Sequence, residues 1–243
     1  MTLIHTGCGL AGLRSLDAGS VDLVFCDLPS GETRAHFDNP IDLDEFWAAA
    51  WPALKPSGAV VLMASSLRYA AQVIASEAKY YRYDVVWEKE RASGFLNAAR
   101  MPLRAHEFLL VFYRALPTYN AQHTSGHTPV NSIRASGVRS SNYGDYEPTG
   151  DRPGGSTDRH PRSVVRTKTV DNKAGCGRRH PQQKPIQLLQ WVVKTYTNEG
   201  DLIADPCAGS GSMGVAAIGL RREFVGWDFE PKPPSAVDVG LFG

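Results

Sequence analysis

Short apolar runs alternate with helical patterns over residues 1–114. Apolar runs of this length are typical of strands buried on both faces. Strands that alternate with helices predict an α/β fold, with a parallel sheet covered on both faces by helices. The strands expected here are VDLVFC (21–26), AVVLMA (59–64), YDVVWEK (83–89) and EFLLVFYR (107–114). The expected helices are IDLDEFWAAAWPAL (41–54) and RYAAQVIASEA (68–78), and the turn KPSG (55–58) follows the first of them.

The same α/β texture returns over residues 180–230. The segment KPIQLLQWVVKTYTNEG (184–200) predicts a helix, with Pro185 in its first turn. Its apolar face carries Ile186, Leu189, Val193 and Tyr196 at helical spacing. A strand DLIADP (201–206), a helix GSMGVAAIGL (211–220) and a strand EFVGWD (223–228) are expected next. The Pro-rich tail after them (231–243) is expected to be loosely ordered.

Residues 115–179 differ from both flanking regions because Gly, Ser, Thr, Pro and Asn dominate them. They hold ten Lys and Arg against five Asp and Glu, a local balance of +5. The charge alone leaves two readings open: a flexible insertion, or a segment that contacts nucleic acid. We expect 1–114 and 180–243 to be two halves of one domain, with 115–179 inserted between them.

Composition excludes several classes of protein. The 243 residues are 42% hydrophobic, which suits one globular domain with an insertion. The net charge of +1 carries no information about partners, and the four Cys form no C-x-x-C pair, so no metal site is expected. No apolar run reaches the roughly 18 residues of a membrane span, and the N-terminus does not resemble a signal peptide. We therefore expect a cytoplasmic protein with no membrane partner.

The segment LIADPCAGSGSMGVAAIGL (202–220) predicts a strand, a Gly-rich turn and a helix, and contains a G-x-G-x-x-G motif at Gly209, Gly211 and Gly214. Asp228 ends the next strand, 23 positions after Asp205, where a carboxylate can bind ribose hydroxyls. Only 29 residues follow Gly214, too few for the rest of a dinucleotide fold, and no Walker lysine follows the loop. DPCAGSGS contains no basic residue for a pyrophosphate. The loop therefore favours an adenosine ligand without phosphates, such as S-adenosylmethionine.

The segment DLPSG (27–31) directly follows the apolar run VDLVFC. An acidic residue and a proline at the end of a buried strand are a common arrangement in active sites. Two readings remain: Asp27 ends a strand and caps a turn, or it belongs to a catalytic loop. The cofactor-type loop elsewhere in the chain favours the second.

Three segments together resemble the β class of amino-methylating DNA methyltransferases. The segments are DLPSG (27–31), WEKERASGFLNAARMPLRAHEFLLVFY (87–113) and HPQQKPIQLLQWVVKTYTNEGDLIADPCAGSGSMGVAA (180–217). Their order matches that class, with the catalytic tetrapeptide (D/S-P-P-Y in the family) first, a variable target-recognition region next and the cofactor loop last. The resemblance covers about residues 4–230.

The resemblance implies a Rossmann-like S-adenosylmethionine-dependent methyltransferase fold, whose seven-stranded sheet has one antiparallel strand. It also implies double-stranded DNA as the partner and a base flipped out of the duplex. Homodimers are common in the class, so the resemblance is compatible with a homodimer.

The resemblance also assigns roles to residues. It places Asp27, Leu28, Pro29 and Ser30 at the catalytic positions. Beside the cofactor it places Asp205, Cys207, Gly209, Gly211, Asp228, His180, Lys184, Pro185 and Cys8. Cys8 stands where the family often has Asp, and Ser30 stands where it has an aromatic residue.

Chemistry at Asp27 follows from the poor nucleophilicity of an exocyclic amine. The Asp27 carboxylate and the Leu28 carbonyl would each accept one N–H hydrogen bond, and Pro29 would keep that carbonyl aimed. Ser30 cannot stack on a base, and the aromatic residues considered for that role are Phe37, Phe95 and Trp87. His36 and His106 are expected to be structural or DNA-facing.

Asp at the first tetrapeptide position favours adenine N6 as the target. Methylation of cytosine N4 stays open, as does a catalytically weakened relative that still binds DNA. Arg159, Arg162, Arg166 and Lys168 are the expected DNA contacts of the inserted segment. Such contacts predict that DNA affinity falls steeply with salt concentration, and that replacing Arg159, Arg162 and Arg166 by Ala makes this fall less steep. An identical salt dependence in the triple variant would argue for a mere spacer.

Overall fold

The computed structural model describes residues 3–33, 38–129, 154–168 and 183–229. The described strands form one sheet in the order β1-β8-β7-β2-β3-β5-β4-β6. Every neighbouring pair is parallel except the two that involve β5, so β5 runs opposite to the rest of the described sheet. The strands are β1 (Leu3–Thr6), β2 (Val21–Cys26), β3 (Leu54–Ala64), β4 (Tyr81–Ser93), β5 (Arg104–Phe112), β6 (Val164–Thr167), β7 (Leu202–Asp205) and β8 (Glu223–Asp228).

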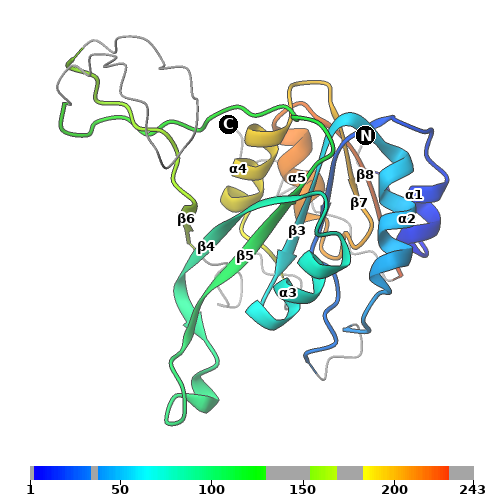
Figure 1. Ribbon diagram of the computed structural model, residues 1–243, viewed down its shortest axis with the longest axis horizontal. Coiled ribbons are helices and arrows are strands. Elements are labelled where there is room, and N and C mark those ends of the chain that lie inside the picture. Colours follow the sequence, from blue (N-terminus) through cyan, green and yellow to red (C-terminus); the bar gives the residue numbers. More distant parts are fainter. Residues whose placement is uncertain (1–2, 34–37, 130–153, 169–182, 230–243) are drawn as a thin grey trace. The chain divides into compact units, whose positions relative to one another are not determined.

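Helices cover both faces of this sheet (Figure 1). Helices α1 (Gly9–Arg14), α2 (Leu43–Ala53) and α3 (Leu67–Ser76) pack on one face, and α4 (Ile186–Tyr196) and α5 (Ser212–Gly219) pack on the other. Alternate residues of β2 supply the two cores, because successive side chains of a strand point to opposite faces. Val24 joins the core beneath α2, and Phe25 joins the core beneath α4. The mostly parallel α/β fold expected from the sequence is confirmed.

The sheet differs from the seven strands expected because β6 adds an eighth at its edge, beside β4. Strand β6 lies within residues 115–179, where the polar composition gave no strand signal. Its four residues, VVRT, have one exposed apolar side chain at Val164, so they lack the continuous apolar run by which the other strands were found. Strand β1 and helix α1 were also not anticipated, because both are short.

Two element boundaries differ from those expected. The segment 55–58 belongs to β3 rather than to a turn, because Leu54 already pairs with Val21 and the ladder resumes at Ala59 after an irregularity. Pro185 is the N-cap residue of α4 rather than part of its first turn, and α4 ends at Tyr196 because Thr197 is extended.

The chain divides into two compact units, of which the second is residues 121–162 and the first is the remainder. In the second unit, the backbones of Thr124 and Arg159 exchange two hydrogen bonds of 3.1 and 2.9 Å. The imidazoles of His123 and His160 lie 3.2 Å apart, Nε2 to Nδ1. These bounds fall inside the expected insertion, 115–179, whose role in DNA contact stays a prediction. None of the described helices is long and apolar enough to span a membrane.

Candidate active site

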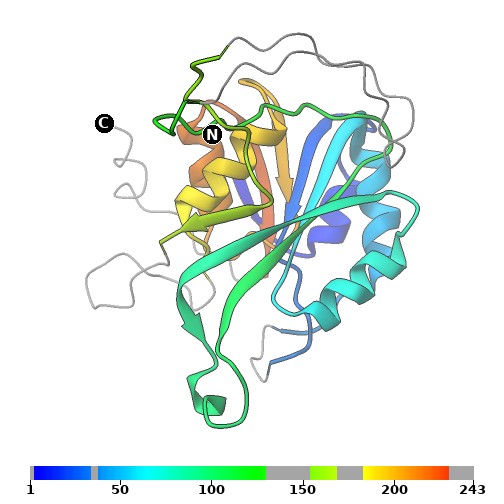
Figure 2. The same cartoon turned by 60° about the vertical axis from the view of Figure 1, so that its left-hand side comes forward.

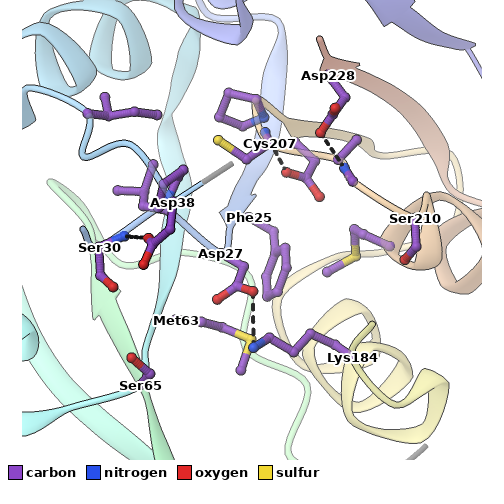
Figure 3. A pocket seen from close by; sticks show the side chains of 18 of the residues that line it. Phe25, Asp27, Ser30, Asp38, Met63, Ser65, Lys184, Cys207, Ser210 and Asp228 are labelled. Atoms are coloured by element: carbon purple, nitrogen blue, oxygen red, sulfur yellow. Dashed lines mark hydrogen bonds and ion pairs between the residues drawn. The ribbon is translucent and has the colours of Figure 1, made fainter. Parts of the chain in front are cut away.

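A cavity of about 1500 Å³ lies at the carboxyl ends of the parallel strands. Its walls come from the segments that follow β1, β2, β7 and β8, which meet there because parallel strands end at the same edge of a sheet. Asp27 and Ser30 contribute from one side, and Cys207 and Asp228 from another (Figure 3). The segments predicted to be the catalytic loop and the cofactor loop therefore line one cavity.

Carboxylates hold the backbone of the predicted cofactor loop. The Gly209 N–H donates to Asp228 Oδ2 at 2.9 Å, and the Cys207 N–H donates to Asp205 Oδ1 at 3.0 Å. Gly209 and Gly211 have φ of 50° and 73°, a left-handed conformation that favours glycine. The loop's shape thus depends on the two acidic residues and the two glycines that the sequence singled out.

The segment after β1, residues 7–9, packs against this loop. A Cβ on Gly9 would lie 1.9 Å from the carbonyl oxygen of Pro206, so only glycine allows α1 to approach so closely. The Gly7 N–H donates to the Asp228 carbonyl at 3.0 Å, and Cys8, which is exposed, lines the cavity between them. The sequence analysis did not single out Gly9. The one sign of a close approach there is a second glycine two positions after Gly7.

Acidic side chains gather in the cavity, where Asp27, Asp205 and Asp228 all line the wall. Burial raises the pKa of Asp205 to about 8, against the hydrogen bond from the Cys207 backbone, and the charges of Asp27 and Asp228 add to the rise. A cavity lined by Asp27, Asp205 and Asp228 suits a cationic ligand better than an anionic one.

Asp38 organises the segment after β2. Its Oδ1 accepts from the N–H groups of Ser30 and Gly31 at 2.7 and 2.9 Å, and its Oδ2 accepts from that of Thr33 at 2.7 Å. Burial alone would raise the pKa of Asp38, but these hydrogen bonds together with the Thr33 side chain lower it. Asp38 therefore remains an anion that fixes the loop. Nothing in the sequence marked it, because its partners come from the fold of the loop.

A chain of alternating charges leads away from Asp27. Lys184 Nζ lies 3.0 Å from Asp27 Oδ2 and 3.1 Å from Glu107 Oε2. Lys89 Nζ lies 3.2 Å from Glu107 Oε1. The Lys89, Glu107 and Lys184 side chains are 8%, 13% and 13% exposed, whereas that of Asp27 is 29% exposed. Asp27 is thus the most exposed of these four charged side chains, and it faces the cavity (Figure 3).

Burial and the neighbouring charges together shift the pKa values of Asp27, Glu107 and Lys184. Burial raises the pKa of Asp27 and Glu107 adds to the rise, although Lys184 opposes both. Burial would lower the pKa of Lys184, but Asp27 and Glu107 raise it, so the ammonium stays protonated. The pKa of Glu107 is lowered because Lys184 and Lys89 outweigh its burial. Lys184 was placed beside the cofactor by resemblance alone, and the structure places its ammonium on Asp27.

The aromatic residues considered as partners for a base lie in different environments. Trp87 lines the cavity but is only 4% exposed, and its Nε1–H donates to Thr167 Oγ1 at 2.9 Å. Phe95 lies at the tip of the β4–β5 hairpin and is 75% exposed. Tyr69, which the sequence did not single out, lines the cavity and directs its hydroxyl to the Pro29 carbonyl at 3.5 Å.

The remaining candidates differ in their positions relative to the cavity. His106 packs edge-on against Phe108, with ring centroids 5.3 Å apart. Leu28 and Pro29 line the cavity, as does Pro185. His36, Phe37 and His180 lie outside the described residues.

None of the four predicted DNA contacts lines this cavity. Arg166 forms a two-point ion pair with Glu88, with N–O distances of 2.7 and 2.8 Å, and Lys168 is exposed. Arg162 is exposed in the second unit, where Arg159 Nη1 donates to the carbonyls of Ser156 and Asp158 at 3.2 and 2.9 Å. The role of these four residues in DNA contact stays a prediction.

The family model and the similar sequences all point to DNA methyltransferases. A family model described as a DNA methylase of the N6_N4_Mtase type matches residues 21–233. The type II methyltransferase M2.DpnII of Streptococcus pneumoniae is 48% identical over 64 residues, which are 26% of this chain and 23% of the relative. The match thus spans about a quarter of that relative's length. The DNA adenine methyltransferase YhdJ of Escherichia coli (strain K12) is 27% identical over 238 residues, 93% of this chain and 77% of YhdJ.

Solved structures share the fold. The M1.HpyAVI–SAM complex superposes with a TM-score of 0.60 at 19% identity, covering 95% of this chain and 94% of that one. The cytosine-N4-specific PvuII DNA methyltransferase superposes with a TM-score of 0.63 at 14% identity, covering 94% and 82% of the two chains. At these identities the likeness concerns the fold alone.

Proposed function

The chain belongs to the DNA methylase family whose model matches residues 21–233, and on that premise we propose that it transfers a methyl group from S-adenosylmethionine to an exocyclic amine in DNA. One observation carries the proposal: the loop that begins at Asp27 and the Gly-rich loop after β7 line the same cavity. A methyl donor held by one loop would therefore lie beside the acidic residue of the other.

The residues of the cavity fit S-adenosylmethionine, which supplies a methyl group activated by a positively charged sulfur. Asp228, at the end of β8, would accept hydrogen bonds from the ribose hydroxyls. The carboxylate of Asp228 would offset the positive charge of the ligand, and Asp205 would hold the loop backbone through the Cys207 N–H. The described loop 205–212 contains no Lys or Arg, so it suits an adenosine ligand without phosphates.

Asp27 would orient the amine that accepts the methyl group. Its carboxylate would accept one N–H hydrogen bond and the Leu28 carbonyl would accept the other, which directs the nitrogen lone pair away from both. Lys184 fixes the position of the carboxylate, and Asp38 fixes the backbone that follows it. These contacts hold the acceptors before a base enters, so that little reorganisation is needed during the transfer.

A proton must leave the nitrogen once it carries the methyl group. The Asp27 carboxylate would already be hydrogen-bonded to that nitrogen, and burial raises the pKa of Asp27 toward that of a group able to take the proton. Lys184, which stays protonated, would then stand beside a neutral carboxyl. No separate base is needed in this scheme.

Adenine N6 is the target that we propose. Asp at the first tetrapeptide position supports it, as does the similarity to YhdJ, whose name specifies adenine. Cytosine N4 is the second candidate, because the PvuII enzyme, which has the same fold, is named as specific for that atom. Both reactions would use the same contacts at Asp27.

Transfer of a labelled methyl group tests the proposal. We expect the chain to move radioactivity from labelled S-adenosylmethionine into unmethylated double-stranded DNA, and into neither RNA nor protein. Incorporation into RNA alone would contradict the proposed substrate. Binding of both DNA and S-adenosylmethionine without incorporation would support the catalytically weakened relative instead.

A further inference from the structure

The tip of the β4–β5 hairpin, residues 94–103, presents a cluster of exposed apolar side chains. Phe95, Leu96, Met101 and Leu103 are 75%, 86%, 55% and 43% exposed. Figures 1 and 2 show, from two directions, that this hairpin tip extends beyond the strands beside it. Apolar side chains gathered in this way on a surface mark a site of interaction.

The described part of the fold gives the tip no packing partner. Strand β3 pairs with β5 only as far as Phe108, and β6 pairs with β4 only as far as Lys89. Beyond these residues the hairpin continues as a two-stranded ribbon, which is marginally stable by itself in water. The apolar tip therefore contributes nothing to either core.

The base of the ribbon is tied to the candidate active site. Lys89 Nζ donates to Ser93 Oγ at 3.1 Å and to Glu107 Oε1 at 3.2 Å, and Ser93 Oγ donates to the Arg104 carbonyl at 3.3 Å. Residues 91–93 line the cavity that contains Asp27. A molecule that binds the tip thus lies next to the rim of that cavity.

We propose that residues 94–103 dock against duplex DNA, with Phe95 and Leu96 wedged into the base stack beside the nucleotide that enters the cavity. The inference rests on the DNA methyl transfer proposed above. A base can reach Asp27 only after it leaves the stack, and unstacking is costly. Apolar side chains that fill the vacated space lower this cost.

Charge favours DNA over a second copy of this chain. Residues 90–104 contain three arginines, Arg91, Arg100 and Arg104, and one acidic residue, Glu90. This excess of positive charge complements phosphates. In a two-fold symmetric dimer formed through the same tip, the arginines of one copy would face those of the other.

A double variant of the tip tests the inference. We expect Phe95→Ser with Leu96→Ser to lower kcat/KM at least about tenfold on native unmethylated genomic DNA. On the same DNA after heat denaturation the loss should be small, because no stack has to be opened. Phe95→Trp, which keeps an apolar wedge, should retain the activity on duplex. Leu116→Ser is the matched control, since Leu116 is 79% exposed but lies outside the tip.

Wild-type activity of the double variant on duplex DNA would overturn the inference, and so would equal losses on duplex and denatured DNA. A wild-type dimer that becomes a fully active monomer in the double variant, measured by sedimentation, would assign the tip to a second copy and also overturn it. Absence of methyl transfer by the wild-type chain to any DNA would instead be a failure of the proposed function.

Discussion

Replacing Asp27 by alanine should abolish methyl transfer while leaving the binding of S-adenosylmethionine nearly unchanged. The residue that would hold the ribose, Asp228, lies on β8, whereas Asp27 follows β2. Loss of a preorganised acceptor costs about 100- to 1000-fold in kcat. Asp27→Asn should also be poor, because an amide oxygen accepts the hydrogen bond of an amine less strongly than a carboxylate does. Calorimetry with S-adenosylmethionine and transfer assays on DNA measure the two effects separately.

Asp228→Ala provides the matched comparison. We expect this variant to lose most of its affinity for S-adenosylmethionine, since a charged acceptor and the contact to the Gly209 N–H are both removed. Full activity in Asp27→Ala would refute the catalytic assignment, and unchanged affinity in a folded Asp228→Ala variant would refute the assignment of the ribose site.

Replacing Lys184 by methionine should move the acid limb of the kcat profile to higher pH. Lys184 lowers the pKa of Asp27 against the effect of burial, so its removal raises that pKa further. The carboxylate is the form that accepts the hydrogen bond, and its fraction at a given pH falls when the pKa rises. We therefore expect kcat at neutral pH to drop by about tenfold, or 1.4 kcal/mol, with partial recovery at alkaline pH.

Lys194→Met on the same helix is the control for this effect. Lys194 is exposed, so its replacement should leave the pH profile unchanged. If Lys184→Met lowers kcat equally at every pH, Lys184 has a structural role only. Lys184→Arg, which keeps the charge, should preserve the position of the acid limb.

The two loops that line the cavity could be predicted because their signals are local. Asp27 and Asp205 each stand at the end of an apolar run, and the glycines of the second loop lie within a few residues of Asp205. A strand followed by such a loop specifies where the side chains will gather, since parallel strands end at one edge. The resemblance added the order of the motifs.

The charged partners of Asp27 could not be predicted because they depend on long-range register. Glu107 reaches Lys184 and Lys89 only because β5 pairs with β4 so that Trp87 lies opposite Glu107. Asp38 likewise acts through the backbone of a loop whose turns the sequence does not encode in an obvious motif. Strand β6 was hidden for a different reason, since its four residues lie in a polar segment and pair at the sheet edge.

The hypothesis that one cavity joins the methyl donor to Asp27 is tested most directly by nucleoside mass spectrometry of DNA. Unmethylated genomic DNA would be incubated with S-adenosylmethionine and either the wild-type chain or Asp27→Ala, and then digested to nucleosides. We expect N6-methyladenine after treatment with the wild-type chain and none above background with Asp27→Ala. N4-methylcytosine in its place would correct the target base but keep the mechanism at Asp27. No methylated nucleoside from the wild-type chain, or equal amounts from both proteins, would contradict the account.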